Sequence, residues 1–274
     1  MKQSDVATQL ASFGIENATG EARQIWEALS TKPFTSFDPT TSEAGIDEVQ
    51  LAYVINRRKA HYPLQYLLGV AWFYGECYEV SPDCLIPRSD TEHIVDYAIH
   101  HLPRGAHFLD MCTGSGCIAI SILAHRPDCK ATAIDISPAA LAIAKRNAER
   151  NHVSDRITFL EADALSYLPP HLYDGMTANP PYIRHNALEH LQTEVKSEPL
   201  LALDGGEDGL VFYRHFCKNL PYYIYKEGFC VFEIGFDQAK DLETLAHEYH
   251  LDYTCQKDYH GEDRVVVVKL TDQR

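Results

Sequence analysis

From His107 onward the chain alternates short apolar runs with amphipathic runs, and this alternation constrains the fold more than any other feature. Strands are expected over 107–111, 130–136, 156–162, 173–179, 228–235, 251–259 and 263–270, and helices over 115–125, 137–151, 208–220 and 238–249. Ser137 and Pro138 are typical of a helix start, where serine caps the free N–H groups and the missing proline N–H is harmless. Strands separated by helices predict an α/β fold with a mostly parallel, doubly wound sheet and an antiparallel last strand.

The residues before this alternation predict a separate helical domain over 1–68. Val6, Leu10 and Phe13 have the spacing of one helical face, and Gly14 follows as a stop. The aromatic-rich stretch 71–80 predicts a β-hairpin inside a linker over 69–88. Ser89, with Glu92 three positions later, predicts a capping box that opens a helix of the main domain, 89–274.

The net charge and the cysteine and histidine content argue against several classes of function. The formal net charge is −15, which repels phosphates, so we expect no direct binding to duplex nucleic acid. None of the 8 cysteines forms a CxxC pair, and no histidine spacing supports a metal site, so no metal is expected. The chain shows no secretory signal and no apolar run near the ~20 residues that a membrane span needs. We therefore expect a cytoplasmic protein without a membrane partner. We also expect a monomer.

A glycine pair directly follows the first strand of the predicted sheet. Gly114 and Gly116 would allow a tight turn and a close approach to a ligand, and Asp135 ends the next strand, 19 positions after Gly116. A carboxylate there can accept hydrogen bonds from both hydroxyls of a ribose. NAD and S-adenosylmethionine both remain possible, but Asp110, just before the loop, would repel a pyrophosphate and tolerate a cationic cofactor. After the third strand, Asp163 could accept a hydrogen bond from an adenine amine, and Ala164 would lie against the ring.

The stretch TANPPYIR, 177–184, places a rigid corner after the fourth strand. Ligands of open α/β sheets bind beyond the carboxyl ends of the strands, so this corner should face the glycine loop. Pro180 and Pro181 have no N–H and a fixed φ, Asn179 adds a side-chain carbonyl, and Tyr182 adds a flat face. The corner therefore suits a planar group that carries an NH₂, held by acceptors and aimed at a methyl group.

These motifs resemble those of amino-methyltransferases. Four further motifs carry a more specific resemblance: PLQYLLGVAWFYG, LIPRSDTE, EPLLALDGGEDGLVFYR and GEDRVVV. The stretch 64–270 resembles the HemK/PrmC-type protein-glutamine methyltransferases that modify release factors. The resemblance implies a Rossmann-like class I methyltransferase sheet, a small N-terminal all-helical domain, and S-adenosylmethionine as cofactor. The implied substrate is the glutamine of the Gly-Gly-Gln motif in peptide chain release factors, methylated on its side-chain amide nitrogen.

The resemblance implies roles for the 112–116 loop, Asp135 and the 179–182 corner, and sequence position adds Asp110, Asp163, Ala164 and Arg88. Cofactor contacts are expected from Asp110, Cys112, Thr113, Gly114, Ser115, Gly116, Asp135, Asp163, Ala164 and Asn179. Substrate contacts are expected from Arg88, Asn179, Pro180, Pro181 and Tyr182, with Asn179, Pro180 and Tyr182 as the catalytic set. Relatives often carry a bulky residue where this chain has Ala164. Arg88 would either help to close the site or form an interdomain salt bridge, and Glu233 is expected to be structural.

The sequence is also compatible with other functions. Sister enzymes modify a glutamine of a ribosomal protein, and IPRSDTE and GEDRVVV favour the release-factor type. A DNA adenine amino-methyltransferase also acts on a planar NH₂, but the acidic charge disfavours it. A non-catalytic adenosylmethionine-binding protein and a nicotinamide dehydrogenase are further alternatives.

Overall fold

A computed structural model describes residues 1–30 and 46–271. The chain divides into two compact units. The smaller comprises Met1–Val70 together with Gln192–Ser197, and the larger comprises Ala71–Leu191 together with Glu198–Arg274. The predicted helical domain, 1–68, falls in the smaller unit, although its residues 31–45 lie outside the described part of the chain. No helix within the described ranges is long and apolar enough to cross a membrane.

The smaller unit contains the helices α1 (Gln3–Ser12), α2 (Ala18–Leu29), α3 (Glu48–Lys59) and α4 (Leu64–Leu68). Val6 and Leu10 are fully buried, as the helical spacing predicts, and Gly14 takes a left-handed conformation after α1. The Asp47 side chain caps α3 by accepting hydrogen bonds from the N–H groups of Val49 and Gln50.

The predicted hairpin is present, but the predicted capping box is wrong. Strands β1 (Val70–Phe73) and β2 (Glu76–Glu79) form a two-stranded sheet. A single 3₁₀ turn, η1 (Ser89–Thr91), then precedes α5 (Glu92–His101), and no side chain caps either element. The Glu92 carboxylate accepts a hydrogen bond from the Tyr74 N–H instead, because the hairpin lies within its reach.

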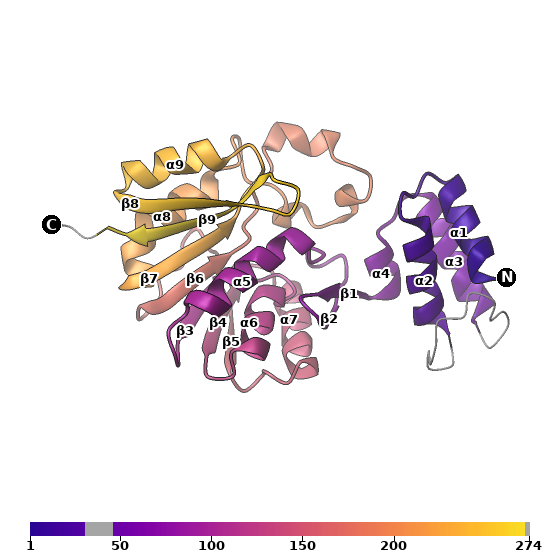
Figure 1. Ribbon diagram of the computed structural model, residues 1–274, viewed down its shortest axis with the longest axis horizontal. Coiled ribbons are helices and arrows are strands. Elements are labelled where there is room, and N and C mark those ends of the chain that lie inside the picture. Colours follow the sequence, from indigo (N-terminus) through magenta and orange to yellow (C-terminus); the bar gives the residue numbers. More distant parts are fainter. Residues whose placement is uncertain (31–45, 272–274) are drawn as a thin grey trace. The chain divides into compact units, whose positions relative to one another are not determined.

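The main sheet has seven strands in the order β5-β4-β3-β6-β7-β9-β8. They are β3 (His107–Met111), β4 (Lys130–Asp135), β5 (Ile157–Glu161), β6 (Tyr173–Ala178), β7 (Ile224–Glu233), β8 (Leu251–Lys257) and β9 (Asp263–Leu270). Neighbours from β5 to β7 pair in parallel, and β9 pairs antiparallel with both β7 and β8. The predicted α/β fold with a mostly parallel sheet and a final antiparallel strand is therefore confirmed (Figure 1).

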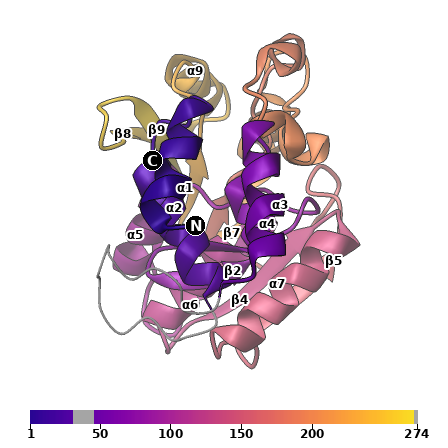
Figure 2. The ribbon, with the colours of Figure 1, turned by 90° about the vertical axis from the view of Figure 1, so that its right-hand side faces the viewer.

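Helices cover both faces of this sheet (Figures 1 and 2). One core contains Phe108 and packs against α5, α6 (Cys117–His125) and α7 (Pro138–Arg150). The other contains the next residue, Leu109, and packs against α8 (Val211–Tyr223) and α9 (Ala239–Glu248). Adjacent strand residues point to opposite faces, so strands buried on both sides read as continuous apolar runs. Three short 3₁₀ segments, η2 (His185–His190), η3 (Val195–Ser197) and η4 (Leu200–Ala202), follow β6.

Candidate active site

A cavity of about 300 Å³ lies beyond the carboxyl ends of the parallel strands, entirely within the larger unit. The loops after β3, β4, β5 and β6 each contribute to its lining, and the segment before α5 closes another side. Its volume is at the lower end of the range for small-molecule sites. Sequence-predicted residues that line it are Arg88, Cys112, Thr113, Gly114, Ser115, Asp135, Asp163, Ala164, Asn179 and Pro181.

The glycine loop after β3 owes its shape to three residues with positive φ: Cys112 at 58°, Gly114 at 54° and Gly116 at 82°. A Cβ built on Gly114 would meet no atom within 4 Å, whereas one on Gly116 would meet Ile120 Cδ1 at 2.8 Å and Ala144 Cβ at 3.2 Å. Gly114 therefore keeps an open space clear, and Gly116 allows α6 and α7 to pack closely.

A buried asparagine that the sequence reasoning missed holds this loop in place. Asn147, on α7, is fully buried, and its Nδ2 donates to the carbonyls of Ser115 (2.9 Å) and Glu79 (3.0 Å). Its Oδ1 accepts from the Glu79 N–H at 2.6 Å. Its position among the apolar residues of an amphipathic helix is the signal that could have revealed it, because a buried amide needs partners.

Asp135, at the end of β4, connects the glycine loop to the start of α7. Its Oδ2 accepts from the Gly114 N–H at 2.8 Å, and its Oδ1 accepts from the Ser137 N–H at 2.9 Å. Burial raises the pKa of this carboxyl group, and the two backbone hydrogen bonds oppose that rise. A carboxylate has about four acceptor positions, so Asp135 keeps lone pairs for hydroxyl donors in the cavity.

Asp110 lies beneath the loop and not on the cavity wall. It is fully buried, and its oxygens accept from the hydroxyls of Thr113 (2.5 Å) and Thr177 (2.6 Å). Burial raises its pKa to about 6. The geometry gives Asp110 a supporting role between β6 and the loop, and its direct contact with a cofactor stays a prediction.

The loop after β5 places Asp163 and Ala164 at the cavity. Asp163 is exposed, and its Oδ1 accepts from the Leu165 N–H at 2.9 Å in a local turn, so it does not cap a helix. Ala164 is buried, with 5% exposure. Phe212, on α8, also lines the cavity, and the sequence reasoning did not single it out.

The hydroxyl group of Ser115 lacks a strong hydrogen-bond partner within the described part of the protein. Its side chain is buried and lines the cavity, and its hydroxyl makes no hydrogen bond apart from a weak contact with the Cys117 thiol. Buried hydroxyls are normally satisfied. The oxygen of Ser115 is therefore suited to a partner that enters the cavity.

The Asn179–Tyr182 corner follows β6, and two of its residues, Asn179 and Pro181, line the same cavity as the glycine loop. Nδ2 of Asn179 donates to Thr91 Oγ1 (3.2 Å) and to Glu233 Oε2 (3.0 Å). The Tyr182 hydroxyl donates to Glu233 Oε1 at 3.2 Å, and burial raises its pKa. Pro180 is buried, and neither Pro180 nor Tyr182 is among the residues that line the cavity.

The stretch LDGGEDG supports this corner from behind. A Cβ on Gly205 would lie 2.7 Å from Tyr182 Cα, and one on Gly209 would lie 2.4 Å from the Tyr182 carbonyl oxygen, so only glycine fits. The Ile183 N–H donates to the Leu203 carbonyl, and Gln238 Nε2 donates to the Tyr182 carbonyl at 3.1 Å. The backbone of the corner is thus held by hydrogen bonds and close contacts from the 203–209 segment and from Gln238.

Arg88 lines the cavity and forms an ion pair with Glu198. The Glu198 side chain is 1% exposed and also accepts from the Ile86 N–H at 3.1 Å. Both partners belong to the larger unit, so this ion pair lies within one unit, and of the two alternatives for Arg88 the interdomain salt bridge is wrong. In the described ranges, no group of three histidine, cysteine or acidic residues is arranged to hold a metal.

Comparison with known proteins identifies the family. Residues 95–216 match the family model "Methyltransferase small domain". The release factor glutamine methyltransferase of Geobacter sulfurreducens is 37% identical, over 94% of this chain and 91% of the relative. The enzyme of the same name from Moorella thermoacetica is 37% identical over 95% and 94% of the two chains, and that of Salmonella typhimurium is 33% identical over 99% and 95%. This chain belongs to the release factor glutamine methyltransferase family.

Solved structures agree on the fold. The ribosomal protein L11 methylase of Lactobacillus delbrueckii subsp. bulgaricus matches 70% of this chain and 84% of its own, with a TM-score of 0.52 and 16% identity. At that identity the likeness concerns the fold alone. The predicted family and its class I methyltransferase sheet are both confirmed.

Proposed function

We propose that this protein transfers a methyl group from S-adenosylmethionine to the side-chain amide nitrogen of the glutamine in the Gly-Gly-Gln motif of peptide chain release factors. The observation that carries the proposal is the set of hydrogen bonds that the Asn179 side chain makes. Its NH₂ group is taken by Thr91 and Glu233, so its Oδ1 is left as an acceptor at a cavity that also holds the glycine loop and Asp135. Membership of the release factor glutamine methyltransferase family supports the choice of substrate.

The residues of the cavity fit S-adenosylmethionine. Its charged lining residues are Asp83, Asp135, Asp163 and Arg88, and Arg88 is paired with Glu198. Such a lining favours a cationic ligand over a pyrophosphate. The under-satisfied Ser115 hydroxyl and the open space beside Gly114 add a donor and room for close approach. The proposed contacts are the 112–116 loop, Asp135 for a ribose, and Asp163 with Ala164 for an adenine.

S-adenosylmethionine, when bound, supplies an electrophilic methyl carbon; this chain's residues have to prepare the nucleophile. A carboxamide nitrogen is a poor nucleophile, because its lone pair is delocalised with a rotation barrier of ~18–20 kcal/mol. Asn179 Oδ1 and backbone carbonyls of the Pro180–Pro181 corner can accept hydrogen bonds from both N–H groups of the substrate amide. These hydrogen bonds orient the amide nitrogen toward the methyl carbon. Fixing the geometry and stabilising positive charge on the nitrogen both lower the barrier. Tyr182 does not line the cavity, and its hydroxyl, bound to Glu233, helps to hold the corner in place.

The remaining parts of the chain take supporting roles in this proposal. Residues 1–68 recognise the release factor, residues 69–88 link them to the transferase domain, and the enzyme works as a monomer. Arg88 holds the cavity wall through Glu198, next to the substrate entrance. The acidic charge of −15 suits a basic protein partner better than duplex nucleic acid.

Mass spectrometry tests the proposal directly. The protein is incubated with S-adenosylmethionine and a purified release factor, and the digest is searched for a methylated glutamine. We expect one added methyl on the Gly-Gly-Gln glutamine, and none on a release factor in which alanine replaces that glutamine. Methyl transfer to a ribosomal protein or to DNA, with none to the release factor, would assign the site to a different substrate.

A further inference from the structure

A buried carboxylate, Glu233, lies behind the Asn179–Tyr182 corner. It ends β7, is 2% exposed and is not among the residues that line the cavity. Its Oε2 accepts hydrogen bonds from Thr91 Oγ1 and Asn179 Nδ2, and its Oε1 accepts from the Tyr182 hydroxyl. Three hydrogen bonds from neighbouring residues converge on one side chain that does not line the cavity.

The chemistry of a carboxylate fixes the orientation of Asn179. An ionised carboxylate only accepts hydrogen bonds, so the amide of Asn179 has to present its NH₂ group to Glu233. The Asn179 oxygen is then directed away from Glu233. If the amide were flipped, its oxygen would face the Glu233 oxygens, and its NH₂ group would be presented to the ligand in place of an acceptor.

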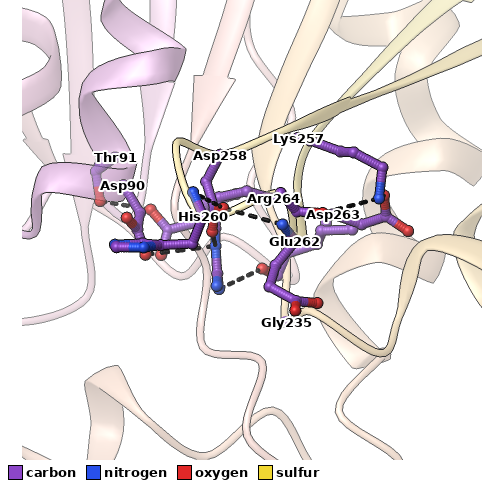
Figure 3. Close-up of polar contacts among 12 residues, drawn as sticks. Asp90, Thr91, Gly235, Lys257, Asp258, His260, Glu262, Asp263 and Arg264 are labelled. Atoms are coloured by element: carbon purple, nitrogen blue, oxygen red, sulfur yellow. Dashed lines mark hydrogen bonds and ion pairs between the residues drawn. The ribbon is translucent and has the colours of Figure 1, made fainter.

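An arginine connects the two segments that meet at Glu233. Arg264, on β9, donates from Nη1 to the carbonyl of Ile234, the residue after Glu233, at 3.2 Å. Its Nε lies 3.5 Å from Asp90, the neighbour of Thr91, and 3.2 Å from Asp258. Asp258 in turn accepts hydrogen bonds from the N–H groups of His260 and Glu262, so these contacts connect Arg264 to the turn between β8 and β9 (Figure 3).

We propose that Glu233 is a positioning residue: with Thr91, and held in place through Arg264, it locks the amide of Asn179 so that the oxygen accepts from the substrate. This deepens the proposed function and rests on it, because the locked oxygen would select a substrate group that donates a hydrogen bond, such as an amide NH₂. The motifs IPRSDTE and GEDR thereby gain a physical role, since they supply Thr91 and Arg264.

The lock depends on the charge of Glu233. Burial raises the pKa of this carboxyl group, against the lowering effects of Thr91, Arg264 and Tyr182, while Asp90 raises it further. The Tyr213 hydroxyl, on α8, binds the Glu233 carbonyl and not its carboxyl group. A protonated Glu233 becomes a donor and no longer enforces one amide orientation. The turnover rate should therefore fall as the pH drops through the pKa of Glu233.

The test compares Glu233→Gln with wild type at saturating S-adenosylmethionine and release factor. A glutamine can donate or accept, so both orientations of Asn179 become possible. We expect kcat to fall by about 10- to 100-fold, the size of one lost hydrogen bond to a charged group, and the acidic limb of the kcat–pH profile to disappear. The dissociation constant for S-adenosylmethionine, measured by calorimetry, should stay within about twofold, because Glu233 does not line the cavity. Glu248→Gln, on the exposed end of α9, is the matched control.

A second pair of variants serves if Glu233→Gln does not fold. Thr91→Val removes a donor to Glu233 at constant shape, so the acidic limb should move to higher pH, and Thr91→Ser, which keeps the hydroxyl, should move it less. Wild-type kcat in Glu233→Gln, or an acidic limb that persists unchanged in it, overturns the inference. So does an equal shift in the two Thr91 variants. If wild type itself methylates no release factor, the proposed function fails instead, and the two failures are distinct.

Discussion

The two glycines of the loop after β3 make a quantitative test of how the site is built. Both have positive φ, so an alanine at either position costs about 1–2 kcal/mol of folding free energy for its backbone alone. At Gly114 nothing lies within 4 Å of an added Cβ, and this is the whole cost. At Gly116 the Cβ would meet Ile120 and Ala144 at 2.8 and 3.2 Å, which adds about 1–3 kcal/mol of overpacking.

Urea unfolding and cofactor binding then separate the two roles. We expect Gly116→Ala to lose about 2–5 kcal/mol and Gly114→Ala only about 1–2 kcal/mol. For cofactor binding by the folded variants we expect the opposite order, with the larger effect in Gly114→Ala. Its added methyl group would enter the cavity, so calorimetry should show an affinity for S-adenosylmethionine lowered by about tenfold or more, which corresponds to about 1.4 kcal/mol. Equal losses of stability in both variants, or wild-type affinity in Gly114→Ala, would refute this reasoning.

Two further predictions concern the acidic residues. Asp135→Ala should weaken S-adenosylmethionine binding by about 10- to 100-fold, the cost of losing a charged acceptor, and unchanged affinity in calorimetry would count against the ribose role. Asp110 has its pKa raised by burial from 3.8 to about 6, so the native state binds more protons than the unfolded state between these values. The free energy of unfolding due to this group therefore falls by about 3 kcal/mol as the pH rises from about 4 to about 6, and is constant above that. Asp110→Asn should consequently gain stability relative to wild type over that interval in urea titrations, and a gap that does not vary with pH would contradict the assignment.

Much of the architecture could be predicted because it depends on local patterns. The strand and helix runs from His107 onward, the serine cap at Ser137 and the hairpin over 71–80 all follow from spacing and residue type. The meeting of the glycine loop with the Asn179 corner also follows, since carboxyl ends of parallel strands share one edge of the sheet.

What could not be predicted depends on contacts between distant segments. Ser89 and Glu92 have the spacing of a capping box, yet Glu92 binds the hairpin, and the hydroxyl of Thr91 binds Glu233, 142 positions away. Asp110 lies near the end of β3, but the sequence does not tell whether its carboxylate reaches the cavity or lies beneath it. The hydrogen bonds that make the difference come from Thr113 and from Thr177 on a neighbouring strand.

The supporting glycines illustrate the same limit. Gly205 and Gly209 stand out in LDGGEDG, but only the structure shows that Tyr182 lies against both of them. The rigid corner is therefore a product of two segments: prolines restrict its own backbone, and glycines elsewhere allow a second backbone to approach it.

The rate of methyl transfer by Asn179→Ala tests the central claim most directly. The account holds that the Asn179 oxygen aims and stabilises the substrate amide, so at saturating S-adenosylmethionine and release factor this variant should be slower by ~10²–10³, as for the loss of one preorganised hydrogen bond at a reacting group. Calorimetry should show cofactor affinity largely intact. A variant that folds, binds S-adenosylmethionine and methylates the release factor at the wild-type rate would contradict the account.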